Sequence, residues 1–246
     1  MSAFLYGVAL QWKLDIRSKS LLITCYLVPL LFFAVMGGIF TALMPEAKTT
    51  LIQSMTVMGV SMGSLIGLPP SLVEIYGSDL KKAYRANGVP LYLGLASACI
   101  SAFIHLLLMS LIIYLIAPLA FGAELPTNPF QYFVSLALFI AVSISVGSVL
   151  GLAMKNQAKL TMVSQIFFLP SIMLSGIMFS ISLLPKGFEI AGMLFPASWG
   201  FRLMTAEVFQ FGSLWPLLII FLAAALLCGI LISKLKSEYK RLVGYT

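Results

Sequence analysis

Long stretches without a single charged residue constrain this chain more than any other feature. They cover residues 20–45, 49–73, 86–123, 125–154, 160–185 and 208–233. Each can supply the roughly 20 apolar residues with which a helix crosses a bilayer. Only 9% of the chain is charged, against roughly 25% in soluble domains. The sequence therefore predicts an all-α membrane protein with one domain over residues 1–246. The expected spans are residues 21–43, 51–73, 91–117, 131–153, 160–182 and 214–232.

The distribution of basic residues indicates how these six spans are oriented. With both termini in the cytoplasm, only Lys48, Lys186 and Arg202 fall on the outer side. The other basic residues fall inside: Lys13, Arg17, Lys19, Lys81, Lys82, Arg85, Lys155, Lys159, Lys234, Lys236, Lys240 and Arg241. This is the bias expected when basic loops stay in the cytoplasm, and an odd number of spans would break it. Topology thus accounts for the net charge of +7, and no nucleic-acid partner is expected. The first apolar run is longer than a signal-peptide core, which predicts an uncleaved first span.

Two segments outside the spans are too apolar for free loops. Residues 1–20 place apolar side chains on one side of a helix, which predicts an interfacial helix on the inner leaflet rather than a plain tail. These side chains are Phe4, Leu5, Val8, Trp12 and Ile16, with Gln11, Lys13, Asp15 and Arg17 elsewhere. Residues 183–207 are too short to cross twice, and one crossing would break the parity of the basic loops. They predict a re-entrant hairpin of two short helices in the outer leaflet, between spans five and six.

Small and polar residues inside the spans admit two interpretations each. Gly59, Gly63 and Gly67 recur every four residues, a spacing that lets helix backbones approach closely in lipid. Static packing within one chain is the favoured interpretation of this seam, and a sliding seam between subunits is the alternative. His105 is the single histidine. We expect it to be hydrogen-bonded to a neighbouring helix, because a proton relay needs an acidic or second basic partner at the same depth.

A short charged segment separates the second and third spans. Its charged and capping residues are Glu74, Ser78, Asp79, Lys81, Lys82 and Arg85. Ser78 can cap a short helix with an acidic first turn and a basic last turn, which suits the helix dipole at both ends. The alternative is an ordinary positive-inside loop.

The sequence contains no recognisable catalytic site. No lysine follows the glycine pattern of a phosphate-binding loop, and the acidic residues flank the spans rather than enter them. Cys25, Cys99 and Cys228 lie in apolar runs, so neither a disulfide framework nor a metal site is expected. We therefore expect a chain that is not an enzyme, binds no cofactor or metal, and takes its energy from a partner.

Several motifs together resemble the ABC type-2 exporter permeases. The order of an interfacial helix, two spans, a charged loop and further spans agrees with these permeases over nearly the whole chain. The loop ends at residues 87–90, which read NGVP; residues 168–179 read FLPSIMLSGIMF, residues 183–185 read LLP, and residues 195–202 read FPASWGFR. The LSGIMF and LLP segments are the most specific of these. The outer hairpin is short for the family, which argues against substrates that need an elaborate outer docking domain.

The resemblance implies a particular assembly. Two permease subunits, identical or homologous, would dock on two cytoplasmic ATP-binding subunits that hold ATP and Mg, in a prokaryotic cytoplasmic membrane. The charged loop would be the coupling helix to the ATPase. The hairpin would close the outer end of the pathway, through Pro170, Gly176, Pro185, Pro196, Trp199 and Arg202.

The function expected from these features is ATP-driven export of an amphipathic or hydrophobic molecule, such as a drug, a peptide or a lipid-like compound. The expected pathway offers mostly apolar and small polar residues, including Thr24, Gln53, Ser61, Ser64 and Gln165. An ion-coupled secondary transporter and a non-transporting membrane assembly or immunity factor are the alternatives.

Overall fold

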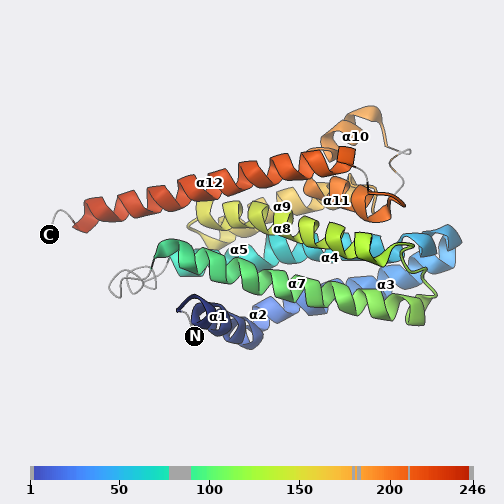
Figure 1. Cartoon of the computed structure of the whole chain (residues 1–246), viewed down its shortest axis with the longest axis horizontal. Helices are drawn as coiled ribbons and strands as arrows, with labels where there is room; N and C mark the ends of the chain where they lie inside the picture. The colour runs from blue at the N-terminus through green and yellow to red at the C-terminus, as the bar shows by residue number, and fades with distance from the viewer. Residues whose placement is uncertain (1–2, 78–89, 179–180, 182–183, 210, 244–246) are drawn as a thin grey trace.

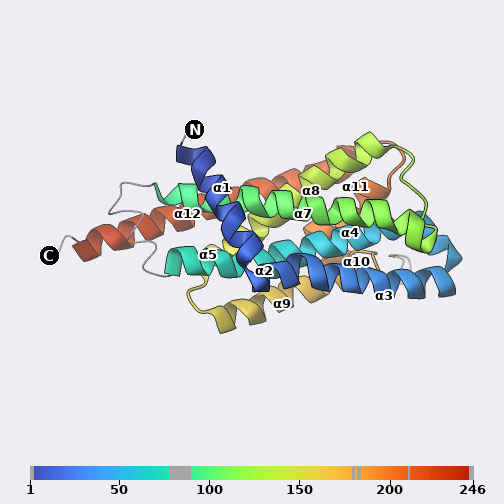
Figure 2. The same cartoon turned by 90° about the horizontal axis from the view of Figure 1, so that it is seen from below.

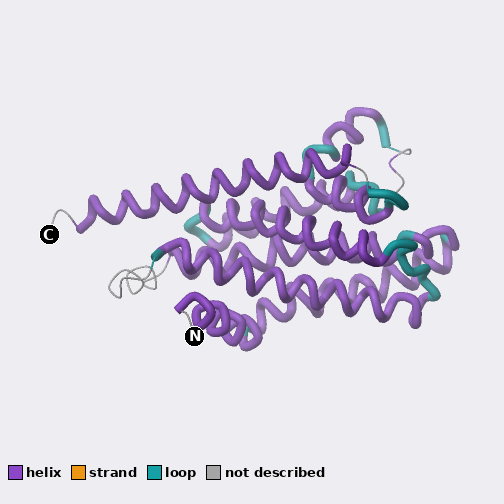
Figure 3. Tube along the Cα trace, viewed as in Figure 1, coloured by secondary structure: helices purple, strands orange, loops and turns teal. Residues whose placement is uncertain are grey.

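A computed structural model describes residues 3–77, 90–178, 181, 184–209 and 211–243. In this part of the chain every regular element is helical, and most helices run along one common direction (Figure 1, Figure 3). The elements are α1 (Ala3–Arg17), α2 (Lys19–Leu22), η1 (Ile23–Leu27), α3 (Val28–Leu43), η2 (Pro45–Thr49), α4 (Leu51–Met62), η3 (Gly63–Gly67), α5 (Leu68–Gly77), α7 (Leu91–Phe121), α8 (Pro129–Ala153), α9 (Gln157–Met173), α10 (Lys186–Gly192), α11 (Pro196–Thr205) and α12 (Phe211–Val243).

Within the described residues, five helical segments are long and apolar enough to cross a membrane. They are Lys19–Leu43, Leu51–Gly77, Leu91–Phe121, Pro129–Ala153 and Phe211–Ser237. They coincide with the first, second, third, fourth and sixth predicted spans. The prediction of an all-α, multi-pass membrane protein is therefore confirmed.

The fifth predicted span differs from the other five. The sequence predicted it over residues 160–182, whereas α9 has 17 residues and ends at Met173. Pro170 lies inside the last turn of α9 without ending it. The chain turns at Gly176, whose φ of 86° is a left-handed conformation that glycine adopts without strain. A helix cannot continue through that residue, so the predicted boundary was too late.

Two other boundaries differ because a helix continues past the end of its apolar run until a residue stops it. The third span continues through Pro118 to Phe121 rather than ending at residue 117, and Gly122, with φ of 61°, closes it as a left-handed C-cap. The sixth span runs from Phe211 into the basic tail as far as Val243, because nothing in that tail breaks a helix.

The first and second spans each contain one π-helical turn. In the first, η1 joins α2 to α3, and in the second, η3 joins α4 to α5. The two turns contact each other, so the widened segments of both spans lie side by side. Single π turns inside α-helices occur often at functional sites.

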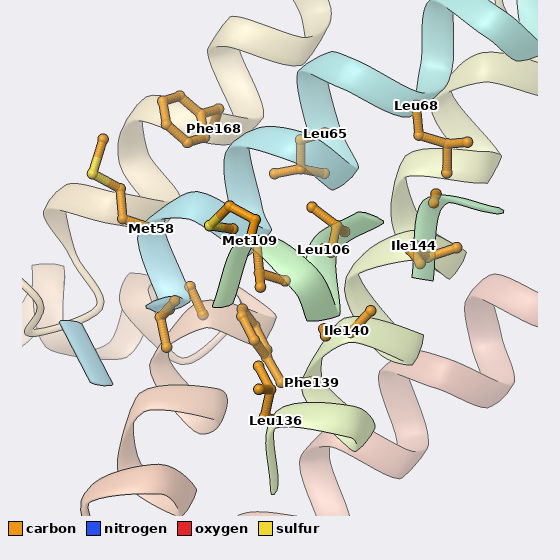
Figure 4. Packing of buried hydrophobic residues seen from close by; sticks show 14 of the residues in the cluster. Met58, Leu65, Leu68, Leu106, Met109, Leu136, Phe139, Ile140, Ile144 and Phe168 are labelled. Carbon is orange, nitrogen blue, oxygen red and sulfur yellow. The ribbon is translucent and has the colours of Figure 1, made fainter. Parts of the chain in front are cut away.

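The second span is the centre of the bundle. Of the 18 most apolar consecutive residues of this span, 89% are buried, compared with 22% in the first span and 17% in the last. Helices α3, α7, α8, α9 and α11 pack around it. Leu106 and Met109 of α7, together with Phe139 of α8, fill the core beside it (Figure 4). α1 lies obliquely across the bundle and packs mainly on α7 (Figure 2).

Candidate functional site

The glycine seam of the second span lies inside this bundle. A Cβ added at Gly59 would approach Met109 Cε to 2.6 Å, and one added at Gly67 would approach Cys25 Sγ to 2.8 Å. A Cβ at Gly63 would overlap Leu106. The three glycines therefore pack against α7 and η1 of the same chain. This arrangement agrees with static packing within one chain.

The described part of the connection between α9 and α12 contains two short helices, α10 and α11 (Figure 1). Pro185 precedes α10, and Pro196 occupies the first turn of α11, where its missing N–H costs nothing. Trp199 Nε1 donates to the Met193 carbonyl at 2.7 Å, and Ser198 Oγ donates to the Gly192 carbonyl at 2.6 Å. These bonds tie the two helices together.

The same hairpin is attached firmly to the bundle. Gln131 Nε2 of α8 donates to the Ala206 carbonyl at 2.8 Å, and Gly192 packs directly on the backbone of Leu174. The Arg202 guanidinium lies 5.2 Å from the centre of the Trp199 ring, within the range of a cation–π contact. α10 nevertheless exposes apolar side chains, with Phe188 55% exposed and Ile190 67% exposed.

Most of the predicted coupling segment, including Ser78, Asp79, Lys81, Lys82 and Arg85, lies outside the described residues. Glu74 is exposed near the end of α5. Gln157 Nε2, at the start of α9, donates to the Pro70 carbonyl at 3.3 Å. The start of α9 therefore lies beside α5, in the half of the second span that leads to the charged segment.

The opposite end carries the turns after α3 and α7. Glu124 N donates to the Lys48 carbonyl at 3.0 Å, so these two turns meet. The α8–α9 connection, assigned to the inner side, and the turns after α3 and α7, assigned to the outer side, thus lie at opposite ends of the described helices.

A buried polar cluster joins α1 to α7, and sequence reasoning missed it. Asp15, expected on the polar side of the interfacial helix, is only 6% exposed. Its carboxylate accepts from Gln11 Nε2 at 2.8 Å and from Ser101 Oγ. Conversely, Leu5 and Ile16, expected on the apolar side, are exposed. The prediction of a helix is confirmed, but the burial of Asp15 was not predicted, because its buried partner on α7 is polar.

His105 lies in the same cluster. The Tyr26 hydroxyl and His105 Nδ1 are hydrogen-bonded at 2.7 Å, so His105 is bonded to a neighbouring helix as expected. The Trp12 and His105 rings are stacked, with centroids 4.0 Å apart and an angle of 12° between planes. His105 also has an acidic neighbour that the sequence did not suggest. This neighbour is Asp15, which lines the same small cavity as His105. Asp15 is the single acidic residue of α1, and that was the signal in the sequence that could have indicated it.

Among the described residues, no group of three or more His, Cys, Asp and Glu side chains is arranged to hold a metal. The polar residues that the sequence predicted along the pathway differ in their surroundings. Gln53, Ser61 and Ser64 are buried in the second span, whereas Gln165 is exposed on α9 and Thr24 bonds to the Ser20 carbonyl. Gln53 Oε1 is buried and finds no partner within the described chain.

Comparison with known proteins identifies the family. A search of curated proteins found no significant match. The family model described as ABC-2 type transporter matches residues 3–209. That range covers most of the chain and includes every helix that packs around the second span. The chain therefore belongs to the ABC-2 type transporter family.

Proposed function

We propose that this chain is the permease subunit of an ABC exporter and moves an amphipathic or hydrophobic substrate outward. The observation that carries the proposal is the family match over residues 3–209, in a chain without a phosphate-binding loop. ATP and Mg then bind to a separate cytoplasmic subunit, and this chain supplies the path through the bilayer.

The membrane arrangement we propose has six spans, with α9 as the fifth. A helix of 17 residues is about 26 Å long, slightly less than the roughly 30 Å hydrocarbon core. Residues 174–178 and the hairpin of α10 and α11 extend that path into the outer leaflet. Both termini then lie in the cytoplasm of a prokaryotic cell, which agrees with the bias of the basic residues.

The proposed assembly pairs two permease subunits, identical or homologous, with two ATP-binding subunits. The charged segment from Glu74 to Arg85 is the proposed coupling helix. The hairpin, anchored to α8 by the Gln131–Ala206 hydrogen bond and packed on Leu174 just after α9, is the proposed outer gate. Exposed apolar surfaces on the first and last spans suit contact with lipid and with a second permease subunit.

The proposed substrate class is supported by the mixture of apolar and small polar side chains in the spans. The second span combines polar side chains, such as Gln53 and Ser64, with closely packed apolar residues. A surface of this kind favours molecules that are apolar over most of their area and carry a few hydrogen-bonding groups.

Reconstitution with the ATP-binding subunit tests the proposal. Proteoliposomes containing both subunits should move amphipathic dyes or peptides only when ATP is supplied, and substrate should stimulate hydrolysis. Transport that persists without the ATP-binding subunit but stops with a protonophore would instead support ion-coupled transport. Copurification without any change in ATPase activity would support an assembly or immunity factor.

A further inference from the structure

The polar cluster between α1 and α7 contains a buried nitrogen without a partner. His105 is 1% exposed, its Nδ1 is engaged by Tyr26, and its Nε2 has no hydrogen-bond partner among the described residues. Either neutral tautomer leaves Nε2 unsatisfied, as a donor in one and an acceptor in the other. A buried polar atom in that condition costs about 1–3 kcal/mol.

The same cluster contains a buried carboxylate without a counter-charge. Within the described residues, Asp15 accepts only from the neutral donors Gln11 and Ser101. Lys13 and Arg17, the nearest basic residues along α1, are exposed. No ion pair to Asp15 occurs among the residues that the structure describes. A buried charge without a counter-charge is strongly unfavourable, and His105 is the nearby group that can supply one.

A small cavity connects these two groups. It is lined by Gln11, Asp15, Cys25, Ser71 and His105, together with apolar residues of the first three spans. About 10 Å³ of it is open to the centre of a water molecule, which is room for about one water. Such a water can bridge the unpartnered nitrogen and the carboxylate.

We propose that Asp15 and His105 form a binding site for one proton, and that the bound proton fastens α1 to α7. The proton comes from bulk water and binds at the imidazole, whose second N–H then donates to the Tyr26 oxygen. No covalent bond between heavy atoms changes. The imidazolium balances the Asp15 charge, and its stacking on Trp12 becomes a cation–π contact, which is stronger than neutral stacking when water is excluded.

Loss of the proton weakens the same contact. A neutral imidazole leaves the buried Asp15 carboxylate without a counter-charge. The other titratable groups facing His105 are the Cys25 thiol and the Tyr26 hydroxyl of η1; η3 and α5 contribute only Gly63, Leu68 and Ser71 to the cavity wall. The cavity also borders both π turns, so the position of α1 is linked to the widened segments of the first two spans.

Fluorescence of Trp12 reports the proton directly, because imidazolium quenches an adjacent indole more strongly than neutral imidazole does. The full chain is purified in lipid nanodiscs, and the emission of Trp12→Phe is subtracted from that of the parent at each pH. The difference should rise through a single one-proton transition as pH increases. His105→Gln should abolish the transition, and Asp15→Asn should move its midpoint down by about 1 pH unit or more.

A distance measurement reports whether α1 is fastened. Spin labels at Tyr6 on α1 and Leu115 on α7, both more than half exposed, should give one narrow distance below the transition and a broad distribution above it. The native cysteines are replaced in this background. The same label pair in His105→Gln is the matched control and should give one distribution at every pH.

Two results would overturn the proposal. The first is a Trp12 transition that survives unchanged in both His105→Gln and Asp15→Asn. The second is a spin-label distance that is the same on both sides of the transition. Neither measurement uses ATP, substrate or a partner subunit, so the proposed export function is tested separately.

Discussion

At Gly147 the backbones of two helices meet with no side chain between them. A Cβ added there would overlap the Ser64 carbonyl oxygen of η3, and backbone atoms cannot rotate away as a flexible side chain can. We expect Gly147→Ala to lower the free energy of unfolding by about 1–3 kcal/mol, as overpacking does elsewhere. Thermal unfolding in nanodiscs measures it.

Gly229 on α12 provides the matched control for that substitution. An added Cβ at this glycine has nothing within 4 Å, and it too lies within a helix. Gly229→Ala should therefore leave the unfolding temperature unchanged or slightly raised, since alanine favours helix. Equal destabilisation by the two variants would show that close approach at Ser64 is not what requires glycine at 147.

At the scale of single elements, the charged segment from Glu74 to Arg85, which begins in the last turn of α5, is the proposed coupling helix. Reversing Lys82 and Arg85 to Glu should leave the permease inserted but weaken association with the ATP-binding subunit and abolish substrate-stimulated hydrolysis. A charge at a partly desolvated contact contributes on the order of 2 kcal/mol, whereas an exposed pair contributes little. Copurification and ATPase assays measure both effects.

The same reversal at Lys236 and Lys240, in the α12 segment, is the control for the coupling loop and should be mild. If the loop variant kept full coupling while the tail variant lost it, the contact with the ATPase would belong to α12.

The depth of the hairpin is a second prediction at this scale. Spin labels at Phe188 and Pro185, both exposed in the isolated chain, should differ in their surroundings. Phe188 should be more accessible to oxygen, which concentrates in lipid, and Pro185 to a water-soluble nickel complex. Half-buried Trp199 should also lie below the headgroups. Equal nickel accessibility at Phe188 and Pro185 would place the whole hairpin in water.

Helix type and approximate position were predictable from sequence, but contacts between elements were not. Absence of charge located all five long apolar helices, and proline and glycine located the two short ones. Asp15 shows the limit of this reasoning, because apolar periodicity finds the face of a helix that meets lipid or an apolar core. It cannot find a face that meets Ser101 and His105, which lie about ninety residues away in the chain.

For the whole molecule, the six-span topology is tested by labelling. Single cysteines at Lys48, Glu124 and Lys186 should react with an impermeant reagent from outside the cell. Cysteines at Lys82, Lys155 and Lys240 should react only after permeabilisation, because basic loops remain in the cytoplasm. Outside labelling at Lys82 or Lys240 would exclude this topology.

The central position of the second span has a consequence for biogenesis. This span is the least apolar of the five, yet α7, α8 and α11, which cover much of it, are synthesised later. Until they arrive, Gln53, Thr56 and Ser64 must be shielded by the translocation machinery or by α3 alone. Thr56 gains its hydrogen bond to the Tyr132 hydroxyl, at 2.9 Å, only when α8 is inserted. Release of this chain into lipid is thus expected to be late and cooperative, with the second span held back until the fourth has joined it.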